Sequence, residues 1–325
     1  MCVIFVIYEK IMVEILIDIV LPVFGLMLVG YLATKAKLFS AESARGLSLF
    51  VFNFAIPVLL FQSVSQARLP DPFEWDFVLS YYLGCAGAWA LGFLLSRLIF
   101  SGHYTTSVLA GMTAGFANTV MLGIPLVLTA YGEAGAVPLF IIISLHSMLL
   151  VGAATVLVEG GRRGTGKIFS IPLNIVRGLN KNPIIIALLL GYIANSLHLE
   201  TPRPLDQIAD MLAAAALPCA VFSMGASLAA YRLQSAIVPA TTWTFLKLVI
   251  HPALVWLLAT YVFDVPPLWR DVAVVIAALP VGINVYLLAQ RYDTGQAATA
   301  SALVLSAAAS FGTVAIVMNL LGTRV

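Results

Sequence analysis

The sequence has few charged residues and no long polar stretch. Asp, Glu, Lys and Arg make up 10% of its 325 residues, whereas an ordinary soluble domain carries about 25%. Hydrophobic residues make up 61%, and the mean hydropathy is +1.02. A spanning helix needs about 20 mostly apolar residues, and apolar runs recur along the whole chain. The sequence therefore predicts an all-α polytopic membrane protein without a separate soluble domain.

Cysteine and net charge are also scarce, and this argues against several classes of site. Cys2, Cys85 and Cys219 do not have the spacing of metal ligands, so we predict no metal site. A net charge of +2 gives no reason to expect nucleic acid as a partner. The segment Gly161–Ile168 resembles a phosphate-binding loop, but Ile168 stands where Ser or Thr would hold Mg²⁺. We therefore predict no cofactor.

Ten apolar spans are expected, with short polar connectors between them. Residues 1–11 have the character of an extension upstream of a start at Met12. The spans are 15–34, 44–63, 77–99, 106–130, 136–158, 184–198, 206–229, 236–262, 270–290 and 297–321.

The distribution of Lys and Arg predicts the orientation of these spans. Alternate loops on one side hold eleven of them, the opposite side with both termini holds five, and Lys247 lies inside a span. Cytoplasmic loops carry the excess of Lys and Arg. Both termini are therefore expected outside the cell, with the basic linker 159–182 in the cytoplasm.

The two halves of the chain resemble each other at a fixed distance. Gly30 and Gly191, Pro57 and Pro218, and Tyr131 and Tyr292 are each 161 residues apart, within similar local sequences. This spacing predicts a repeat of five spans in 1–158 and another in 183–325. Because five is odd, the second repeat enters the membrane from the opposite side, as in many secondary transporters.

Two apolar segments, 111–125 and 278–286, are interrupted by Asn, Gly and Pro. A broken helix at membrane depth is tolerated only where it is buried in protein or lines a cavity. A matching pair of broken segments, one per half, points to a transporter's substrate site. The candidate site residues are Asn118, Gly123, Pro125, Pro280, Gly282, Asn284 and Tyr286.

These segments resemble the auxin efflux carrier family, and the resemblance covers nearly the whole chain from about Met12. Its long plant exporters have a hydrophilic central loop that this chain lacks, so the chain is similar to a compact prokaryotic member, expected in the inner membrane. The family includes bacterial carriers associated with malonate, malate or similar carboxylates. The supporting motifs are Leu21-Pro22, Gly30-Tyr31-Leu32, Asn182-Pro183, Leu217-Pro218 and Gly225-Ala226-Ser227-Leu228.

The resemblance implies ten helices in two inverted repeats. It also implies a scaffold and a transport domain that move against each other in an elevator-like mechanism. The fourth helix of each repeat is expected to break at a proline where the two cross. A homodimer is plausible for this architecture, and coupling to H⁺ or Na⁺ stays open.

The chemistry expected at the breaks is that of an anion site. The N-terminus of a half-helix presents backbone N–H groups and a partial positive charge, which together can hold a carboxylate. Asn118 and Asn284 can donate and accept hydrogen bonds, and we expect both to contact substrate. The alternative is that they only cap the broken helix ends.

Five further residues are weaker candidates. Lys247 inside a span can attract an anion, pair with another group, or extend toward the membrane interface. His146 can relay a proton or be a hydrogen-bonded interior residue. Asn53 is a candidate for orienting the crossing or an ion, and Pro57 and Pro218 are candidates for kinks.

The lead hypothesis is a secondary carrier of a small organic anion rather than an enzyme. An intramembrane enzyme would need paired Asp residues, a Ser/His pair or a metal set, and no such arrangement is visible in the spans. A receptor that binds the ligand without moving it is the other alternative.

Overall fold

The computed structural model describes residues 15–67, 73–161, 182–199, 201–231, 233 and 236–322. The predicted extension before Met12, Cys2, and residues 162–181 of the basic linker lie outside the described residues. So does most of the segment that resembles a phosphate-binding loop. The two repeats predicted from the sequence, 1–158 and 183–325, are therefore described only in part.

Every regular element in the described ranges is a helix. Here η denotes a π-helical turn, except η4, which is a 3₁₀ turn. The elements are η1 (Ile15–Val20), α2 (Leu21–Lys35), α3 (Ala41–Phe50), η2 (Val51–Ala55), α4 (Ile56–Gln66), α5 (Trp75–Leu98), α6 (Tyr104–Gly115), η3 (Thr119–Gly123), α7 (Ile124–Tyr131), η4 (Gly132–Gly135), α8 (Ala136–Gly161), α10 (Pro183–Ser196), α11 (Arg203–Leu228), α12 (Ile237–Phe245), η6 (Leu246–Ile250), α13 (His251–Leu257), η7 (Leu258–Val262), α14 (Pro267–Ala278), α15 (Asn284–Arg291) and α16 (Gln296–Leu321).

Seven helical stretches in the described residues are long and apolar enough to cross a membrane. The protein is therefore a polytopic helical membrane protein, as predicted. α6, α10 and α14 are shorter, at 12, 14 and 12 residues. A 12-residue helix is only about 18 Å long, less than the roughly 30 Å of a hydrocarbon core. α6 and α14 would therefore need the segments that follow them to complete a crossing.

Four of the five π turns in the described residues lie directly before a helix with proline in its first turn, and η7 is the exception. Pro22, Pro57, Pro125 and Pro252 each lie in the first turn of the α-helix that follows a π turn. Proline lacks the N–H that would bond to the carbonyl four residues earlier. A π turn there redistributes the backbone hydrogen bonds, so the chain stays helical through these prolines. Pro57 is thus accommodated without a break in its span.

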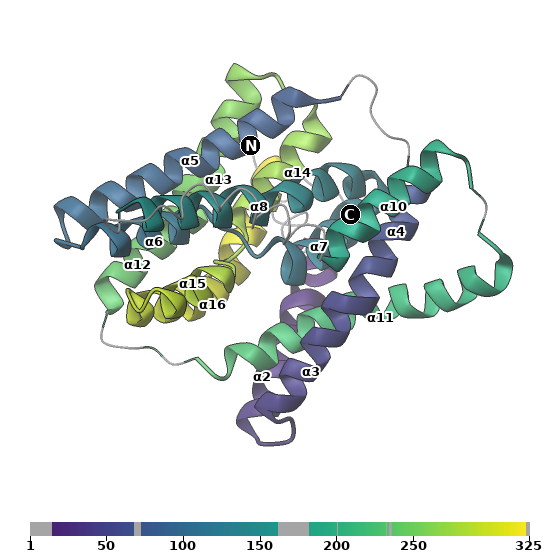
Figure 1. Cartoon of the computed structure of the whole chain (residues 1–325), viewed down its shortest axis with the longest axis horizontal. Helices are drawn as coiled ribbons and strands as arrows, with labels where there is room; N and C mark the ends of the chain where they lie inside the picture. Colours follow the sequence, from purple (N-terminus) through teal and green to yellow (C-terminus); the bar gives the residue numbers. More distant parts are fainter. Residues whose placement is uncertain are drawn as a thin grey trace, which may run out of the picture.

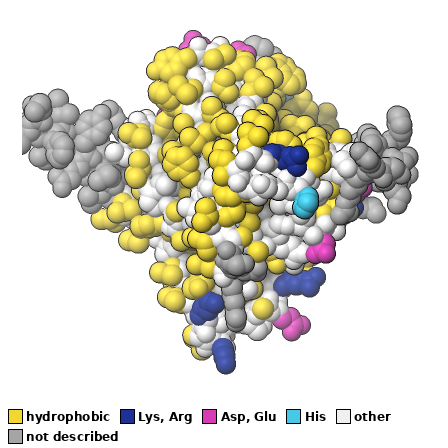
Figure 2. Space-filling view, turned by 90° about the vertical axis from the view of Figure 1, so that its left-hand side faces the viewer, with side chains coloured by type: hydrophobic (Ala, Val, Ile, Leu, Met, Phe, Trp, Pro, Cys, Tyr) yellow, Lys and Arg dark blue, Asp and Glu magenta, His cyan; other side chains and the backbone are white. Residues whose placement is uncertain are grey.

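The helices form two groups that meet along one boundary (Figure 1). α2 packs on α11, and α4 packs on α10, while α3 also contacts α11. α5 lies beside α6 and α13, and α14 contacts both α13 and α16. Figure 2 shows apolar side chains over much of one face, with most of the Lys and Arg toward its lower end and a further basic patch in its upper half. This is the surface expected of a protein surrounded by lipid.

Two glycines make the same close contact in the two halves. A Cβ on Gly30 of α2 would collide with the backbone oxygen of Phe222 on α11. A Cβ on Gly191 of α10 would lie 2.9 Å from the backbone oxygen of Phe61 on α4. Phe61 and Phe222 are themselves 161 residues apart, so the 161-residue shift exchanges one contact for the other. Small residues allow this close backbone approach between membrane helices.

We predict that Gly30→Val destabilises the protein, because its side chain would meet backbone atoms that cannot rotate away. Overpacking of this kind costs about 1–3 kcal/mol, which thermal unfolding in detergent would measure. Gly25→Val on the same helix is the control, since nothing lies within 4 Å of a Cβ at Gly25. Equal melting temperatures for the two variants would contradict the packing described here.

Candidate functional site

Both interrupted segments leave the helical conformation inside the molecule. α6 ends at Gly115, Phe116 is extended (φ −91°, ψ 113°), and the helix resumes at Thr119. α14 ends at Ala278, Leu279 is extended (ψ 155°), and α15 begins at Asn284. Leu279 precedes a proline, and such residues disfavour the helical region. Local sequence thus accounts for the second break directly.

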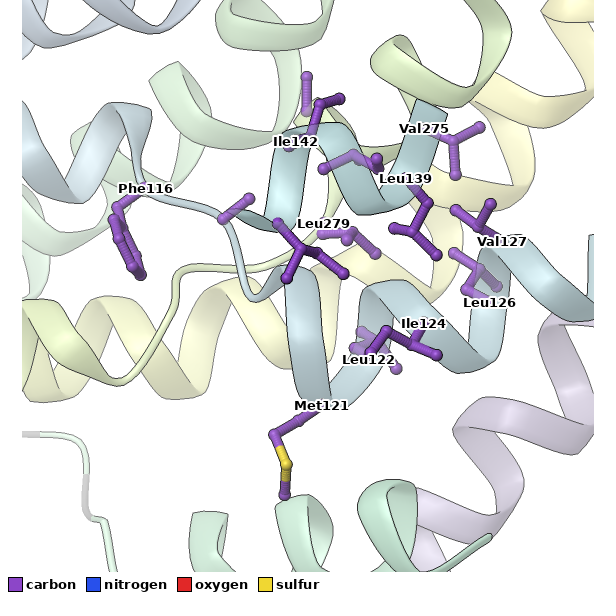
Figure 3. Packing of buried hydrophobic residues seen from close by; sticks show 14 of the residues in the cluster. Phe116, Met121, Leu122, Ile124, Leu126, Val127, Leu139, Ile142, Val275 and Leu279 are labelled. Carbon is purple, nitrogen blue, oxygen red and sulfur yellow. The ribbon is translucent and has the colours of Figure 1, made fainter. Parts of the chain in front are cut away.

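The two extended segments cross and hydrogen-bond to each other. The Asn118 backbone N–H donates to the Pro280 carbonyl at 2.9 Å, and the Gly282 N–H donates to the Phe116 carbonyl at 3.1 Å. Ala117 and Val281 form the antiparallel bridge between these bonds. Figure 3 shows the extended chain after Phe116 passing close to the segment that carries Leu279. Asn118 and Gly282 each donate through the backbone N–H to a carbonyl of the other segment. In this pairing Gly282, and not Asn284, corresponds to Asn118.

Glycine is required at position 282 because the extended segment 116–118 lies against it. A Cβ there would lie 2.5 Å from the Phe116 ring and 3.0 Å from the Ala117 oxygen. Any larger residue would push the two segments apart.

The two remaining N–H groups of the crossing are held by side chains from neighbouring helices. The Ala117 N–H donates to His146 Nε2 on α8 at 3.0 Å, and the Val281 N–H donates to Ser306 Oγ on α16 at 3.1 Å. Because Nε2 accepts, the imidazole proton belongs on Nδ1, which faces the Tyr81 hydroxyl at 3.5 Å. His146 is fully buried. It is therefore the hydrogen-bonded interior histidine that was one of the two alternatives.

The expectation that Pro125 breaks the first helix is wrong. The break spans 116–118, and Pro125 lies in the first turn of α7, after the π turn 119–123. The π turn accommodates the proline, as it does elsewhere in the chain. In the second segment Pro280 does lie within the break.

A cavity of about 300 Å³ opens beside the crossing, and three helix N-termini face it. Helices resume at Thr119 and begin at Asn284, and α10 begins at Pro183 behind its capping residue Asn182. The lining comprises Phe52, Phe116, Ala117, Asn118, Thr119, Val120, Met121, Ile143, Ser144, Ser147, Met148, Asn182, Ile184, Ile185, Gly282, Ile283 and Asn284. Among these residues none is charged.

Asn118 and Asn284 both line this cavity, but their side chains differ in their hydrogen bonds. Asn118 Oδ1 accepts from the Met121 N–H at 3.3 Å, and its Nδ2 lies 3.3 Å from Met224 Sδ. Asn118 therefore caps a broken helix end. The Asn284 side chain has no hydrogen-bond partner in the part of the chain that the structure describes, so its amide is available to a ligand.

Of the other sequence-predicted residues of the two segments, Gly282 lines the cavity, whereas Gly123, Pro125, Pro280 and Tyr286 do not. Gly123, Pro125 and Pro280 are buried. Tyr286 lies on α15 with its ring 5.0 Å from that of Tyr231, and its hydroxyl accepts from Gln290.

The weaker candidates lie away from the cavity. Asn53 is exposed and donates to the Leu49 carbonyl within its own helix. Pro57 is buried, and Pro218 is exposed within the continuous helix α11. Lys247 is fully buried and does not extend to an interface.

Sequence reasoning missed four polar residues around the site. Ser144, Ser147 and Asn182 line the cavity, and Ser306 anchors the crossing. For Asn182 a signal was present, since Asn followed by Pro is typical of a helix start. The serines lie in apolar helices, where a single serine is common, and only the fold brings them to the site.

An apolar helical bundle with two broken helices crossing inside it and a polar cavity at the crossing defines a membrane transport protein. The family profile described as "Membrane transport protein" matches residues 15–318. The chain belongs to this family, and it is a transporter and not an enzyme.

Individual relatives agree with this assignment. The chain is 30% identical over 302 residues to the "Putative malonate transporter" of Rhizobium meliloti (strain 1021), covering 91% of this chain and 92% of that protein. It is 25% identical over 279 residues to the "Uncharacterized transporter YfdV" of Escherichia coli (strain K12), covering 84% and 87%. It is 27% identical over 335 aligned residues to "Auxin efflux carrier component 8" of Arabidopsis thaliana, covering 84% and 88%. The resemblance to the auxin efflux carrier family is confirmed.

We predict that His146→Leu destabilises the protein, because it leaves the buried Ala117 N–H without an acceptor. An unsatisfied buried donor costs about 1–3 kcal/mol. His146→Gln keeps an acceptor and is expected to lose less, as measured by the melting temperature in detergent. If His146→Leu and His146→Gln both have the melting temperature of the wild type, His146 does not stabilise the crossing.

Proposed function

We propose that the protein is a secondary carrier of a small organic anion, a mono- or dicarboxylate, which binds in the cavity beside the crossing. The observation that carries this proposal is the meeting of three helix N-termini at one cavity whose described lining residues include no charged one. Each N-terminus carries a partial positive charge and N–H groups without intrahelical partners; Asn118 and Asn182 each cap one of these groups at two of the three helix starts. Together the three helix starts favour an anion and disfavour a cation.

The polar side chains of the lining suit a carboxylate. Ser147 on α8 and Asn284 on α15 offer donors, and Asn182 and Thr119 lie at two of the helix starts. A volume of about 300 Å³ is at the small end of ligand pockets. A compact acid of the malonate or malate kind fits this size, and malonate appears in the name of one relative.

The transport mechanism we propose is elevator-like alternating access, with ten spans in two inverted repeats. Two observations support the repeats: the Gly30 and Gly191 contacts exchange under the 161-residue shift, and the crossing exchanges its hydrogen bonds. The division of the helices into two groups supports a scaffold and a moving domain. The cavity lies at their boundary, since Phe52 and Asn182 come from one group and Asn118 and Asn284 from the other.

The proposal places the carrier in the bacterial inner membrane. Both termini are outside, and the basic linker is in the cytoplasm, as the distribution of Lys and Arg indicates.

Uptake into proteoliposomes tests the function directly. Purified protein should give saturable uptake of at least one labelled acid among malonate, malate and indole-3-acetate, above that of protein-free liposomes. No uptake of any of these acids by folded protein would contradict a carrier of this class. Binding without uptake would support the receptor alternative.

We predict that Asn284→Ala lowers uptake about tenfold without changing the melting temperature, because its amide has no partner in the described structure. Tenfold corresponds to about 1.4 kcal/mol, close to the lower limit of about 1.5 kcal/mol for one hydrogen bond to a charged group. Asn118→Ala is expected to lower both uptake and stability, since it also removes a helix cap worth about 1 kcal/mol. Asn53→Ala is the control for an exposed asparagine. Normal uptake by Asn284→Ala would remove this residue from the site.

A further inference from the structure

A single charged side chain is buried within the helical bundle. Lys247 on η6 is fully buried, and it is the one Lys, Arg, Asp or Glu with this burial among the described residues. Its segment contacts α5, α6, α14 and α16, so helices surround it on several sides. An ionised ammonium without compensation is costly in such a place.

The compensation for Lys247 comes from the backbone of the second broken helix. Lys247 Nζ donates to the carbonyl of Ala277, the next-to-last residue of α14. The last carbonyls of a helix have no intrahelical partner, and they carry a partial negative charge. Because α14 ends at Ala278 and Leu279 is extended, the last carbonyls of α14 lie inside the protein, without an intrahelical partner and away from water.

No carboxylate in the described ranges pairs with Lys247. The one ion pair of the described residues joins Arg270 and Asp271. The titratable side chains that interact with Lys247 are instead Cys85, His146 and His251, and Cys85 Sγ and His251 Nε2 lie 3.2 Å apart. The ammonium therefore faces the carbonyl end of α14 as the one full charge in its surroundings.

We propose that Lys247 is a built-in cation at the crossing, occupying the place that a bound coupling cation would otherwise fill at the carbonyl end of α14. Carbonyl oxygens at broken helix ends are where transporters coordinate Na⁺. Here the proposal puts a tethered ammonium in that place, donating to the Ala277 carbonyl. Lys247 is thus a positioning residue: it stabilises the broken end of α14 and keeps the crossing in place without an external ion.

Chemical rescue of a cavity variant tests this proposal without any transport assay. Lys247→Ala removes three methylene groups and the ammonium, which n-propylammonium matches in size and charge. We expect Lys247→Ala to melt several degrees below the wild type, and n-propylammonium to restore much of the loss. n-Propanol is the neutral control, since it can donate a hydrogen bond but carries no charge. Equal rescue by both compounds, or no loss in the variant, would overturn the proposal.

Two further variants keep the test decisive if Lys247→Ala cannot be purified. Lys247→Arg keeps the charge, and Lys247→Met fills the space without it. If Lys247 acts as a built-in cation, Lys247→Arg should have a higher melting temperature than Lys247→Met. A Met variant as stable as the Arg variant or more stable would mean that charge is not needed there.

The consequence for transport rests on the proposed function and has its own readout. Wild-type uptake of malonate should be equal in NaCl and choline chloride, because the carbonyl end is already neutralised. A several-fold requirement for Na⁺ in the wild type would overturn the role of Lys247 as a substitute cation. Absence of uptake under both conditions would instead count against malonate as the substrate, while the rescue experiment would still decide the role of Lys247.

Discussion

The structure depends on the pairing of two interrupted helices through their own backbones. Within a bilayer no water is available to satisfy free N–H and C=O groups, so neither break is tolerated alone. The bonds from Asn118 to Pro280 and from Gly282 to Phe116 close part of this deficit. Each segment therefore exists in its extended form because the other lies against it.

Some backbone N–H and C=O groups of the two broken helices are not bonded between the two segments. Their surroundings differ from one group to the next. His146 and Ser306 hold the inner N–H groups, and Lys247 holds a carbonyl at the end of α14. The helix starts at Thr119 and Asn284 instead face the cavity. Under the proposed role of Lys247, the carbonyl end is neutralised from within, while the helix starts lie beside the cavity, the first of them capped by Asn118. This asymmetry is the basis on which we propose an anion as the substrate.

Sequence alone predicted the helical class, the two interrupted segments and the presence of Asn118 and Asn284 near one place, because composition and local interruptions are readable residue by residue. It misplaced the first break at Pro125, since a π turn that accommodates a proline leaves no mark in the sequence. It also could not show that Asn118 caps a helix while the Asn284 side chain has no hydrogen-bond partner among the described residues. Asn118 bonds to the N–H of Met121, three residues along the chain, and to Met224, which only the folded chain brings to it.

The most direct test of the central claim is the position of a bound anion. A crystal of the protein grown with bromomalonate would locate the acid through the anomalous scattering of bromine. The account predicts a peak in the cavity between Asn118, Asn182 and Asn284, beside the crossing. A bound acid elsewhere in the protein, with this cavity empty, would contradict it.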